Sequence, residues 1–355
     1  MKFVHIADMH FDTPFTLLSS RRELGEARRM EQRQAFKKAI NYIKENNIPY
    51  LFIAGDLYEQ EYVKQSTIEY INNLFKEIPE TKIYISPGNH DPNISNSYYN
   101  KYKWSENVKK IFTSKIEKIE EPEFTLYGFG FDDFYCYKSG IEEIQIEDKT
   151  KTNILLTHAS LDGGYDDQRE YNTLSSKKLK ELGFDYIALG HIHKIKLTDN
   201  IIFPGSMVSM GFDELGKHGM LVGEIEQKQV KIEFIELDER EFKEEEIDIT
   251  EIETIEELLQ KIVELKLEEK NYYKIILTGK RNFEINTYKI YKQIEIKNII
   301  KIKDKTKLNY NLEEISKEIS LKGIFAKEML KKLQNENINK ETIEKAIEIG
   351  MEVLS

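Results

Sequence analysis

Five short apolar segments of the chain each end in side chains that commonly bind divalent metal ions. In chain order, the clusters at their ends are Asp8-Met9-His10, Gly55-Asp56, Gly88-Asn89-His90-Asp91, Thr157-His158 and Gly190-His191-Ile192-His193. Carboxylate, imidazole and amide groups, with no thiolate among them, suit borderline-hard ions such as manganese, iron or zinc. These clusters offer more ligands than one tetrahedral ion takes, so they predict two ions that share a carboxylate.

The elements that must position these clusters alternate between strands and helices. The five apolar runs are nearly continuous in hydrophobicity, as strands buried on both faces are. They cover residues 3–7, 50–54, 82–85, 153–157 and 185–189, and helical periodicity covers 30–44 and 66–76. This alternation predicts an α/β sandwich, in which sites form at the carboxyl ends of the strands. Residues i and i+2 of a strand point to the same side, so Asp8 with His10 can aim at one point.

The remainder of the chain predicts a second, smaller domain. Residues 219–225 and 230–235 read as a hairpin that closes the first domain, which we place at 1–240. The glutamate-rich stretch 238–248 is either a linker or a solvated edge strand. A second domain at 250–355 then begins with a capping box at Thr254. Its further predicted elements are strands over 272–278 and 294–302 and two helices at the end of the chain.

Composition sets broad limits on the function. The chain has 355 residues, a net charge of −11 and a single cysteine, Cys136, so an internal disulfide is excluded. We expect a soluble, cytoplasmic protein with no membrane association, because neither a signal-peptide pattern nor a run of spanning length occurs. The negative charge argues against unspecific nucleic-acid binding over the whole surface, but it leaves room for a local basic path.

Taken together, the clusters resemble the motifs of the calcineurin-like metallophosphoesterases over roughly the first 220 residues. The stretches HIADMHFDTPF, LFIAGDLYE, SPGNHDP, SYYNKYKWSENVKKIF and ALGHIHK followed by FPGS are similar to its DNA-repair exonuclease branch, which includes SbcD-like and YhaO-like proteins. The resemblance implies a four-layer β-sandwich flanked by helices, with a smaller C-terminal α+β capping domain. It also implies a DNA substrate, a role in DNA repair, an SMC-like coiled-coil ATPase subunit as partner, and homodimerisation.

The resemblance also implies roles for individual residues. One metal ion would be held by Asp8, His10, Asp56 and His193, and the other by Asp56, Asn89, His158 and His191. Such enzymes typically use Mn²⁺, with Fe²⁺ or Zn²⁺ as alternatives. His90 would face the scissile phosphate as the catalytic group, and we expect Asp91 to bind backbone amides of its own turn. The chain departs from many nuclease relatives at Glu59, where they carry a histidine that assists near the phosphate.

Weaker signals concern substrate binding, and each has a structural alternative. Arginines follow the first metal cluster, and Arg28, Arg29 and Arg33 are candidates for phosphate contacts, with a solvated helix face as the alternative. Arg21 and Arg22 belong to the same cluster, and Ser206 is a candidate for substrate contact or for tight-turn chemistry. The aromatic residues of 98–104 stack bases or pack in the core. The lysine-rich stretch 274–307 steers DNA or is a solvated surface.

Three functions therefore remain open. The first is a two-metal DNA exonuclease, with or without endonuclease activity. The second is a phosphatase or phosphodiesterase for a small nucleotide-type substrate, which would use the same metals. The third is a metal-binding scaffold that supports an ATPase partner, an alternative that the substitution at Glu59 keeps open.

Overall fold

A computed structural model describes residues 1–19, 22–163, 171–334 and 339–354, and these divide into two compact units. The first unit covers Met1–Phe242 and the second Lys243–Ser355. Of the arginines that follow the first metal cluster, Arg21 lies outside the described residues. Each unit is considered by itself below.

Two six-stranded sheets form the centre of the first unit in the part of the chain that the structure describes. The first sheet has the order β12-β11-β1-β2-β3-β4 and the second has the order β5-β6-β7-β8-β10-β9. The strands of the first sheet are β1 (Lys2–Ile6), β2 (Tyr50–Ile53), β3 (Lys82–Ile85), β4 (Val108–Ile111), β11 (Gly219–Glu226) and β12 (Gln229–Glu236). The strands of the second sheet are β5 (Glu117–Glu120), β6 (Phe124–Phe129), β7 (Thr152–His158), β8 (Tyr186–Gly190), β9 (Lys196–Thr198) and β10 (Ile201–Phe203).

The inner strands of both sheets run parallel, so their carboxyl ends lie at the same edge. In the first sheet β1, β2, β3 and β4 pair in parallel, while β11 pairs antiparallel to β1. In the second sheet β6, β7, β8 and β10 pair in parallel. All five predicted strands exist, and the predicted hairpin is the pair β11 and β12.

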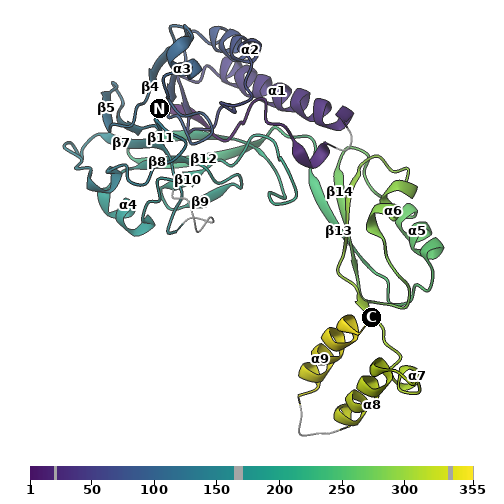
Figure 1. Ribbon diagram of the computed structural model, residues 1–355. Helices are drawn as coiled ribbons and strands as arrows, with labels where there is room; N and C mark the ends of the chain where they lie inside the picture. Colours follow the sequence, from purple (N-terminus) through teal and green to yellow (C-terminus); the bar gives the residue numbers. More distant parts are fainter. Residues whose placement is uncertain (20–21, 164–170, 335–338, 355) are drawn as a thin grey trace. The chain divides into compact units, whose positions relative to one another are not determined.

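Helices cover the outer faces of the sheets and complete four layers (Figure 1). They are η1 (Thr16–Leu18), α1 (Arg22–Glu45), α2 (Gln65–Lys76), α3 (Tyr98–Lys101), η2 (Ile141–Glu143) and α4 (Ser176–Leu182). Phe36 and Ile71, on α1 and α2, pack against Ile53 of the first sheet. Phe52 of the first sheet packs with Ile154 of the second in a core between the sheets. This arrangement confirms the predicted α/β sandwich flanked by helices.

The second unit has a three-stranded sheet and several helices. Its elements are β13 (Phe242–Asp248), α5 (Ile255–Val263), β14 (Tyr272–Thr278), β15 (Lys280–Arg281), α6 (Thr287–Gln293), β16 (Ile299–Asp304), β17 (Lys307–Leu308), α7 (Leu312–Ile315), α8 (Leu321–Leu333) and α9 (Lys340–Val353). The sheet order is β13-β14-β16, and one face packs on α5 and α6. The Thr254 hydroxyl accepts a hydrogen bond from the Glu257 amide, which confirms the predicted N-cap, while the Glu257 carboxylate accepts from the Glu253 amide and not from that of Thr254.

Two predictions about this part of the chain need correction. The linker interpretation of 238–248 is wrong, because Phe242–Asp248 forms the edge strand β13, which was the alternative. The strand predicted over 294–302 begins only at Ile299, because α6 occupies the preceding segment and Ile294 is its C-terminal cap. The sequence shows the charged run of the first segment and the apolar run of the second, but it does not show the strand with which each one pairs in the sheet.

Among the helices in the described ranges, none combines the length and the apolar character that crossing a membrane requires.

Candidate metal centre

The predicted metal ligands lie where the carboxyl edges of the two sheets approach each other. Loops after β1, β2 and β3 bring ligands from the first sheet, and the ends of β7 and β8 bring those from the second. Gly190 permits this approach, since a Cβ atom there would lie 1.9 Å from the carbonyl oxygen of Ala54. Gly55 has a φ of +86°, and a Cβ atom there would meet the His158 ring at 2.4 Å. Glycine is therefore required at both positions for the sheets to close around the centre.

Five of the seven predicted ligands offer atoms that converge on this point. Within the described residues, ligand atoms lie less than 4.8 Å apart in three groups: Asp8, His10 and His193; Asp8, Asp56 and His158; and His10, Asp56 and His90. The Nε2 atoms of His10 and His193 are 3.1 Å apart. Nε2 of His158 lies 3.0 Å from Oδ1 of Asn89 and 3.3 Å from a carboxylate oxygen of Asp56. Asp8, His10 and Asp56 each belong to two of these groups, and the role of Asp56 as the shared carboxylate stays a prediction.

Three of the histidines are oriented by a partner on their other ring nitrogen. Nδ1 of His158 donates to the Ala54 carbonyl at 2.9 Å. Nδ1 of His10 donates to the Glu59 carboxylate at 2.8 Å, and Nδ1 of His193 donates to the Glu214 carboxylate at 3.3 Å. A hydrogen bond at Nδ1 fixes the tautomer that leaves the Nε2 lone pair free for a metal ion. This pattern is typical of metal-binding histidines and would have no purpose in an apolar core.

The electrostatics of the centre also favour a cation. Burial raises the pKa of Asp8, and nearby His193 and His158 only partly offset this. Burial also acts to raise the pKa of Asp56, but the positive charges of His158 and His90 lower it well below the usual range. Burial lowers the pKa of His158 and of His193, but their carboxylate neighbours raise both to about 9. Protons therefore occupy these imidazoles at neutral pH, and metal ions would replace them.

The backbone at the ligands is strained. Asp8, His10 and Asp56 have φ angles of 52°, 45° and 53°, in the left-handed region that non-glycine residues rarely adopt. Such strain persists only where the surrounding contacts hold it, and it concentrates at functional sites. The Asp8 and His10 amides donate to the carbonyls of Gly55 and Asp56, which holds the first loop against the second.

His191 contributes to the centre in a different way from the other ligands. Its backbone amide donates to both carboxylate oxygens of Asp8, at 2.9 and 3.1 Å. Its ring centroid is 5.2 Å from that of His158, and burial lowers its pKa to about 3. Its imidazole is therefore neutral, as a metal ligand must be, but it belongs to none of the three converging groups in the described chain. Its role as a ligand stays a prediction.

Glu59 links His90 to the metal centre. One carboxylate oxygen accepts a hydrogen bond from Nδ1 of His10 at 2.8 Å, and the other from Nδ1 of His90 at 2.9 Å. Burial acts to lower the pKa of His90, but Asp56 and Glu59 raise it to about 10. The His90 side chain is 44% exposed, whereas the side chain of His10 is almost fully buried. Glu59, the position at which the sequence resemblance implies a histidine, therefore fixes the rings of both His10 and His90.

Asp91 ties the turn together as predicted. Its carboxylate accepts from the backbone amides of Asp56, Leu57 and Gly88 at 3.0, 2.6 and 2.7 Å, and from the Tyr99 hydroxyl at 2.6 Å. These contacts hold the loops after β2 and β3 in register. The prediction that Asp91 binds backbone amides is confirmed.

A second supporting network was not foreseen from the sequence. The Glu214 carboxylate that binds His193 also accepts from the Ser206 hydroxyl at 2.9 Å, and this hydroxyl lies 2.9 Å from Nδ1 of His218. Glu214, Ser206 and His218 are all buried. Glu214 follows no strand and has no motif spacing, so only its contact with a ligand reveals it. Of its members only Ser206 was named from the sequence, as a candidate for substrate contact or tight-turn chemistry, and His218 lies in the turn that precedes β11.

Two of the four predicted substrate contacts are buried in the structure, which favours their structural alternatives. Arg28 is fully buried, and its guanidinium binds the carboxylate of Asp238 and the carbonyl of Ser209. Ser206 is also fully buried within the network just described. Arg33 binds Asp12 at 3.1 Å and Thr67 at 2.9 Å, which connects α1 to the first metal loop and to α2. Arg29 is partly exposed, and its contact with substrate stays a prediction.

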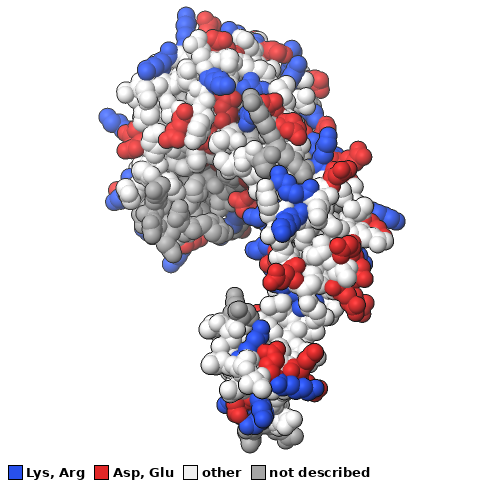
Figure 2. All heavy atoms as spheres, turned by 45° about the vertical axis from the view of Figure 1, so that its right-hand side comes forward, with Lys and Arg blue, Asp and Glu red and all other residues white. Residues whose placement is uncertain are grey.

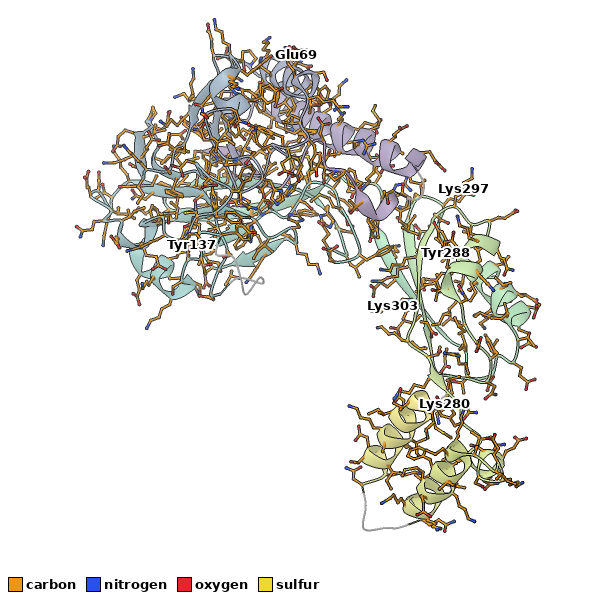
Figure 3. The ribbon with its side chains drawn as sticks, in the orientation of Figure 1. Glu69, Tyr137, Lys280, Tyr288, Lys297 and Lys303 are labelled. Carbon is orange, nitrogen blue, oxygen red and sulfur yellow. The ribbon has the colours of Figure 1, made fainter. Side chains whose placement is uncertain are left out.

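Of the two other weak signals, the aromatic one resolves in favour of its structural alternative, and DNA steering by the lysine-rich stretch stays a prediction. The aromatic residues of 98–104 pack against the core beneath α2, and the Trp104 indole donates to the Tyr98 carbonyl. The lysines of 274–307 do not form one strip, because Lys280 and Lys297 lie at opposite ends of the sheet of the second unit (Figure 3). In Figure 2, Lys and Arg side chains are interspersed with Asp and Glu over the face in view.

Two facing sheets with carboxylate and imidazole ligands at their shared carboxyl edge define a metal-dependent phosphoesterase. Residues 1–195 match the family described as calcineurin-like phosphoesterase, so this protein belongs to that family. The family binds a dinuclear metal site, and the donors found here fit it, because imidazole and carboxylate oxygen are ligands that borderline divalent ions accept.

Three curated relatives match at low identity. The "Uncharacterized metallophosphoesterase YhaO" of Bacillus subtilis is 25% identical over 74% of this chain and 66% of its own length. The SbcD component of the SbcCD nuclease of Staphylococcus saprophyticus is 24% identical over 67% of this chain and 69% of its own. The "DNA double-strand break repair protein Mre11" of Methanopyrus kandleri is 23% identical over 67% and 57%. The chain thus spans about two thirds of the length of the Bacillus subtilis relative and less than two thirds of the length of the Methanopyrus kandleri relative.

Proposed function

We propose that the protein is a two-metal phosphodiester hydrolase that acts on DNA as an exonuclease in repair or recombination. The observation that carries the proposal is the convergence of ligands from both sheets beside a partly exposed imidazole, His90, held by Glu59. Two relatives of the chain are named for nuclease and double-strand break repair functions, which supports DNA as the substrate.

The proposed metal ligands are those of the sequence prediction. One ion would be held by Asp8, His10, Asp56 and His193, and the other by Asp56, Asn89, His158 and His191. When bound, two such ions supply positive charge for a phosphate and activate water for in-line attack. We propose Mn²⁺ as the metal, with Fe²⁺ or Zn²⁺ as the alternatives that the same donors accept.

The residues of the chain account for the rest of the mechanism. Glu59 occupies Nδ1 of His90, so Nε2 is the ring atom available to the substrate. Burial acts to lower the pKa of this imidazole, but Asp56 and Glu59 raise it to about 10, which favours the protonated ring. It can therefore donate a hydrogen bond or a proton to the oxygen that leaves phosphorus. Asp91 and Gly88 hold the turn so that Asn89 faces the metal side while its neighbour faces the substrate.

The proposal is tested by digesting end-labelled single- and double-stranded DNA with added Mn²⁺. Cyclic dinucleotides and bis(p-nitrophenyl) phosphate are assayed in parallel. We expect release of nucleotides from the DNA ends. Cleavage of the small substrates alone would support a small-nucleotide phosphodiesterase instead, and absence of cleavage together with absence of bound metal would support a scaffold role.

His90→Ala separates catalysis from metal binding. We expect it to bind metal as tightly as the wild type and to lose cleavage by about 10²–10⁴-fold, the usual contribution of a general acid. His10→Ala serves as the comparison, because it should lose metal as well as activity. Metal content is measured on the purified variants after dialysis with Mn²⁺. Loss of metal from His90→Ala would make His90 a ligand, as its place in one converging group allows.

The partners of the protein are also proposals. One relative is named as part of a nuclease complex, and the sequence resemblance points to an SMC-like coiled-coil ATPase as the second component.

In the second unit, Lys301 and Lys303 are exposed on the sheet face opposite α5 and α6, and Figure 3 shows Lys303 on that side. This face is the one we propose to contact DNA.

A further inference from the structure

A groove with four tyrosine and phenylalanine rings in its lining opens beside His90. It has a volume of about 380 Å³ and reaches the proposed metal ligand Asn89 and the proposed catalytic His90. Tyr62, Phe134, Tyr135 and Tyr171 contribute its aromatic rings. None of these four residues belongs to the sequence motifs considered above. A ligand whose phosphate lies at the metal centre therefore places the next group of its structure in this groove.

The aromatic rings continue outward from the metal centre. The Tyr171 ring lies 5.4 Å from that of His191, and Tyr135 stacks on Tyr171 with centroids 6.0 Å apart and an angle of 24° between the planes. Tyr135 and Tyr62 retain 37% and 52% of their surface exposed. Offset stacking of this kind presents flat π surfaces to a further ring.

The charge of the groove shows which part of a substrate it suits. Among the described residues that line it, none is a lysine or an arginine, while two are the carboxylates Glu59 and Glu61. Glu59 is already engaged by two histidines, and Glu61 is exposed. Apart from the imidazole of His90, which would serve the scissile phosphate, the described lining offers no cationic group to a second phosphate, while its rings accept a neutral aromatic group. A nucleobase has this chemistry, and every base has a π face that can stack on tyrosine.

We propose that this aromatic groove binds the nucleobase next to the scissile phosphodiester, through stacking on Tyr62 and Tyr135. The proposal rests on the proposed phosphodiesterase function and adds a base subsite to it. A base inside a duplex is stacked on its neighbours and cannot enter the groove. The protein should therefore act on a nucleotide that is unpaired when it reaches the metal centre, at single-stranded or frayed ends.

The test compares DNA with and without a base at the reacting position. Single strands carry an abasic residue on one side or the other of the terminal phosphodiester, in separate sets for the 3′ and the 5′ end. We expect the wild type to show a KM at least about tenfold higher for one abasic position than for the natural strand, with kcat little changed. Tyr62→Ala and Tyr135→Ala should raise KM for the natural strand similarly and leave KM for that abasic strand unchanged.

Two controls keep the result specific. Tyr137→Ala removes a tyrosine that is 68% exposed and does not line the groove, and Figure 3 labels it on the surface of the first unit. This variant should change KM neither for the natural strand nor for the abasic strand. Tyr135→Phe retains the ring without the hydroxyl, so its KM for the natural strand should be well below that of Tyr135→Ala.

A second readout does not depend on turnover. Strands that carry 2-aminopurine at the positions of the abasic residues are bound to the protein in the presence of Ca²⁺. Quenching of the 2-aminopurine fluorescence then reports stacking on tyrosine. Equal KM for natural and abasic strands, with no quenching, would overturn the base subsite even if DNA is cleaved. Quenching that Tyr135→Ala abolishes, in a protein that cleaves no phosphodiester, would retain the subsite and overturn the proposed function.

Discussion

The imidazole and carboxylate groups of the centre act in pairs, in which one residue binds or reacts and another orients it. Glu59 has two such tasks, because its oxygens bind Nδ1 of His10 and of His90. A histidine at this position could not accept two ring protons at once. At the position where the sequence resemblance implies an assisting histidine, the chain therefore has a residue that orients a proposed ligand and the proposed catalytic group together.

Glu59→Gln should lower activity more than it lowers metal affinity. The amide keeps the shape of the side chain but has one acceptor oxygen, so one of the two histidines loses its partner. Loss of such outer-shell contacts typically costs about 10–100-fold in metal affinity or activity. We expect kcat on a labelled strand to fall by that range, with metal content retained at saturating Mn²⁺.

The matched control for Glu59→Gln is Glu61→Gln, two residues along the same loop. Glu61 is exposed and lines the same groove. Its kcat should stay within about twofold of the wild type. Equal losses in the two variants would show that loop charge matters rather than the orientation of the rings.

At the scale of elements, α1 is held to the rest of the first unit by a buried ion pair. Arg28 binds Asp238 and the Ser209 carbonyl, and Glu31 binds Arg28 at 2.8 Å and Arg240. Burial acts to lower the pKa of Arg28, but the two carboxylates raise it. The helix carries Gln32, whose amide donates to the Met9 and His10 carbonyls, so its position bears directly on the first metal loop.

Arg28→Met should destabilise the first unit strongly. Removing one partner of a buried ion pair leaves Asp238 uncompensated, which costs about 3–5 kcal/mol. Arg29→Met, on the same helix but partly exposed, should cost within about 0.5 kcal/mol. Urea unfolding monitored by tryptophan fluorescence measures both, since Trp104 lies in the core beneath α2. A loss below about 1 kcal/mol for Arg28→Met would contradict the structural role and reopen a role in substrate binding.

The elements also show what the sequence could predict. β1, β2, β3, β7 and β8 are buried on both faces, so their runs of apolar residues were unmistakable, and the ligands at their ends followed from them. β4 and β5 are short and alternate partly buried with exposed residues, such as Lys109 and Lys118, and no apolar run marked them. Edge or near-edge strands of this kind are defined by their neighbours, which lie elsewhere in the chain.

The residues that support the site could not be predicted from the sequence for the same reason, because their partners lie elsewhere in the chain. Glu214 lies 21 residues from His193 in the sequence, and the partner of Arg28 lies 210 residues away. Neither distance has a periodicity that a pattern could show. Arg28 follows the first metal cluster closely in sequence, which suggested a phosphate contact, but the helix turns its side chain inward.

At the scale of the whole first unit, the metal centre joins the two sheets. Asp8, His10, Asp56 and Asn89 come from the first sheet, and His158, His191 and His193 come from the second. Each bound ion would thus have ligands in both, and it would act as a cross-link that exists only in the folded state.

Metal ions should therefore raise the melting temperature of the first unit. At a free concentration of about 100 times the dissociation constant, the gain is about 2.7 kcal/mol, or roughly 5–10 °C for a unit of this size. The shift should be larger at pH 8 than at pH 6, because His158 and His193 have pKa values of about 9 and protons compete with the metal. Differential scanning calorimetry with Mn²⁺ and with EDTA measures it.

The control for this prediction is His193→Ala, which removes one ligand from the second sheet. Its melting temperature should respond less to Mn²⁺ than that of the wild type. A wild-type protein whose transition does not move with Mn²⁺, Fe²⁺ or Zn²⁺ would contradict a centre that bridges the sheets.

The union of two sheets at one centre has a consequence for synthesis on the ribosome. Asp8 and His193 are separated by about 185 residues, which take roughly 10–40 s to translate. For most of that interval Asp8, His10 and Asp56 have been made, but the imidazoles of His158, His191 and His193 have not. Two carboxylates with one imidazole accept hard ions such as Mg²⁺, whereas the three added imidazoles favour transition metals. If these residues hold the ions, selection of the metal is a late event in the maturation of the chain, and it depends on the ions present when the second sheet closes.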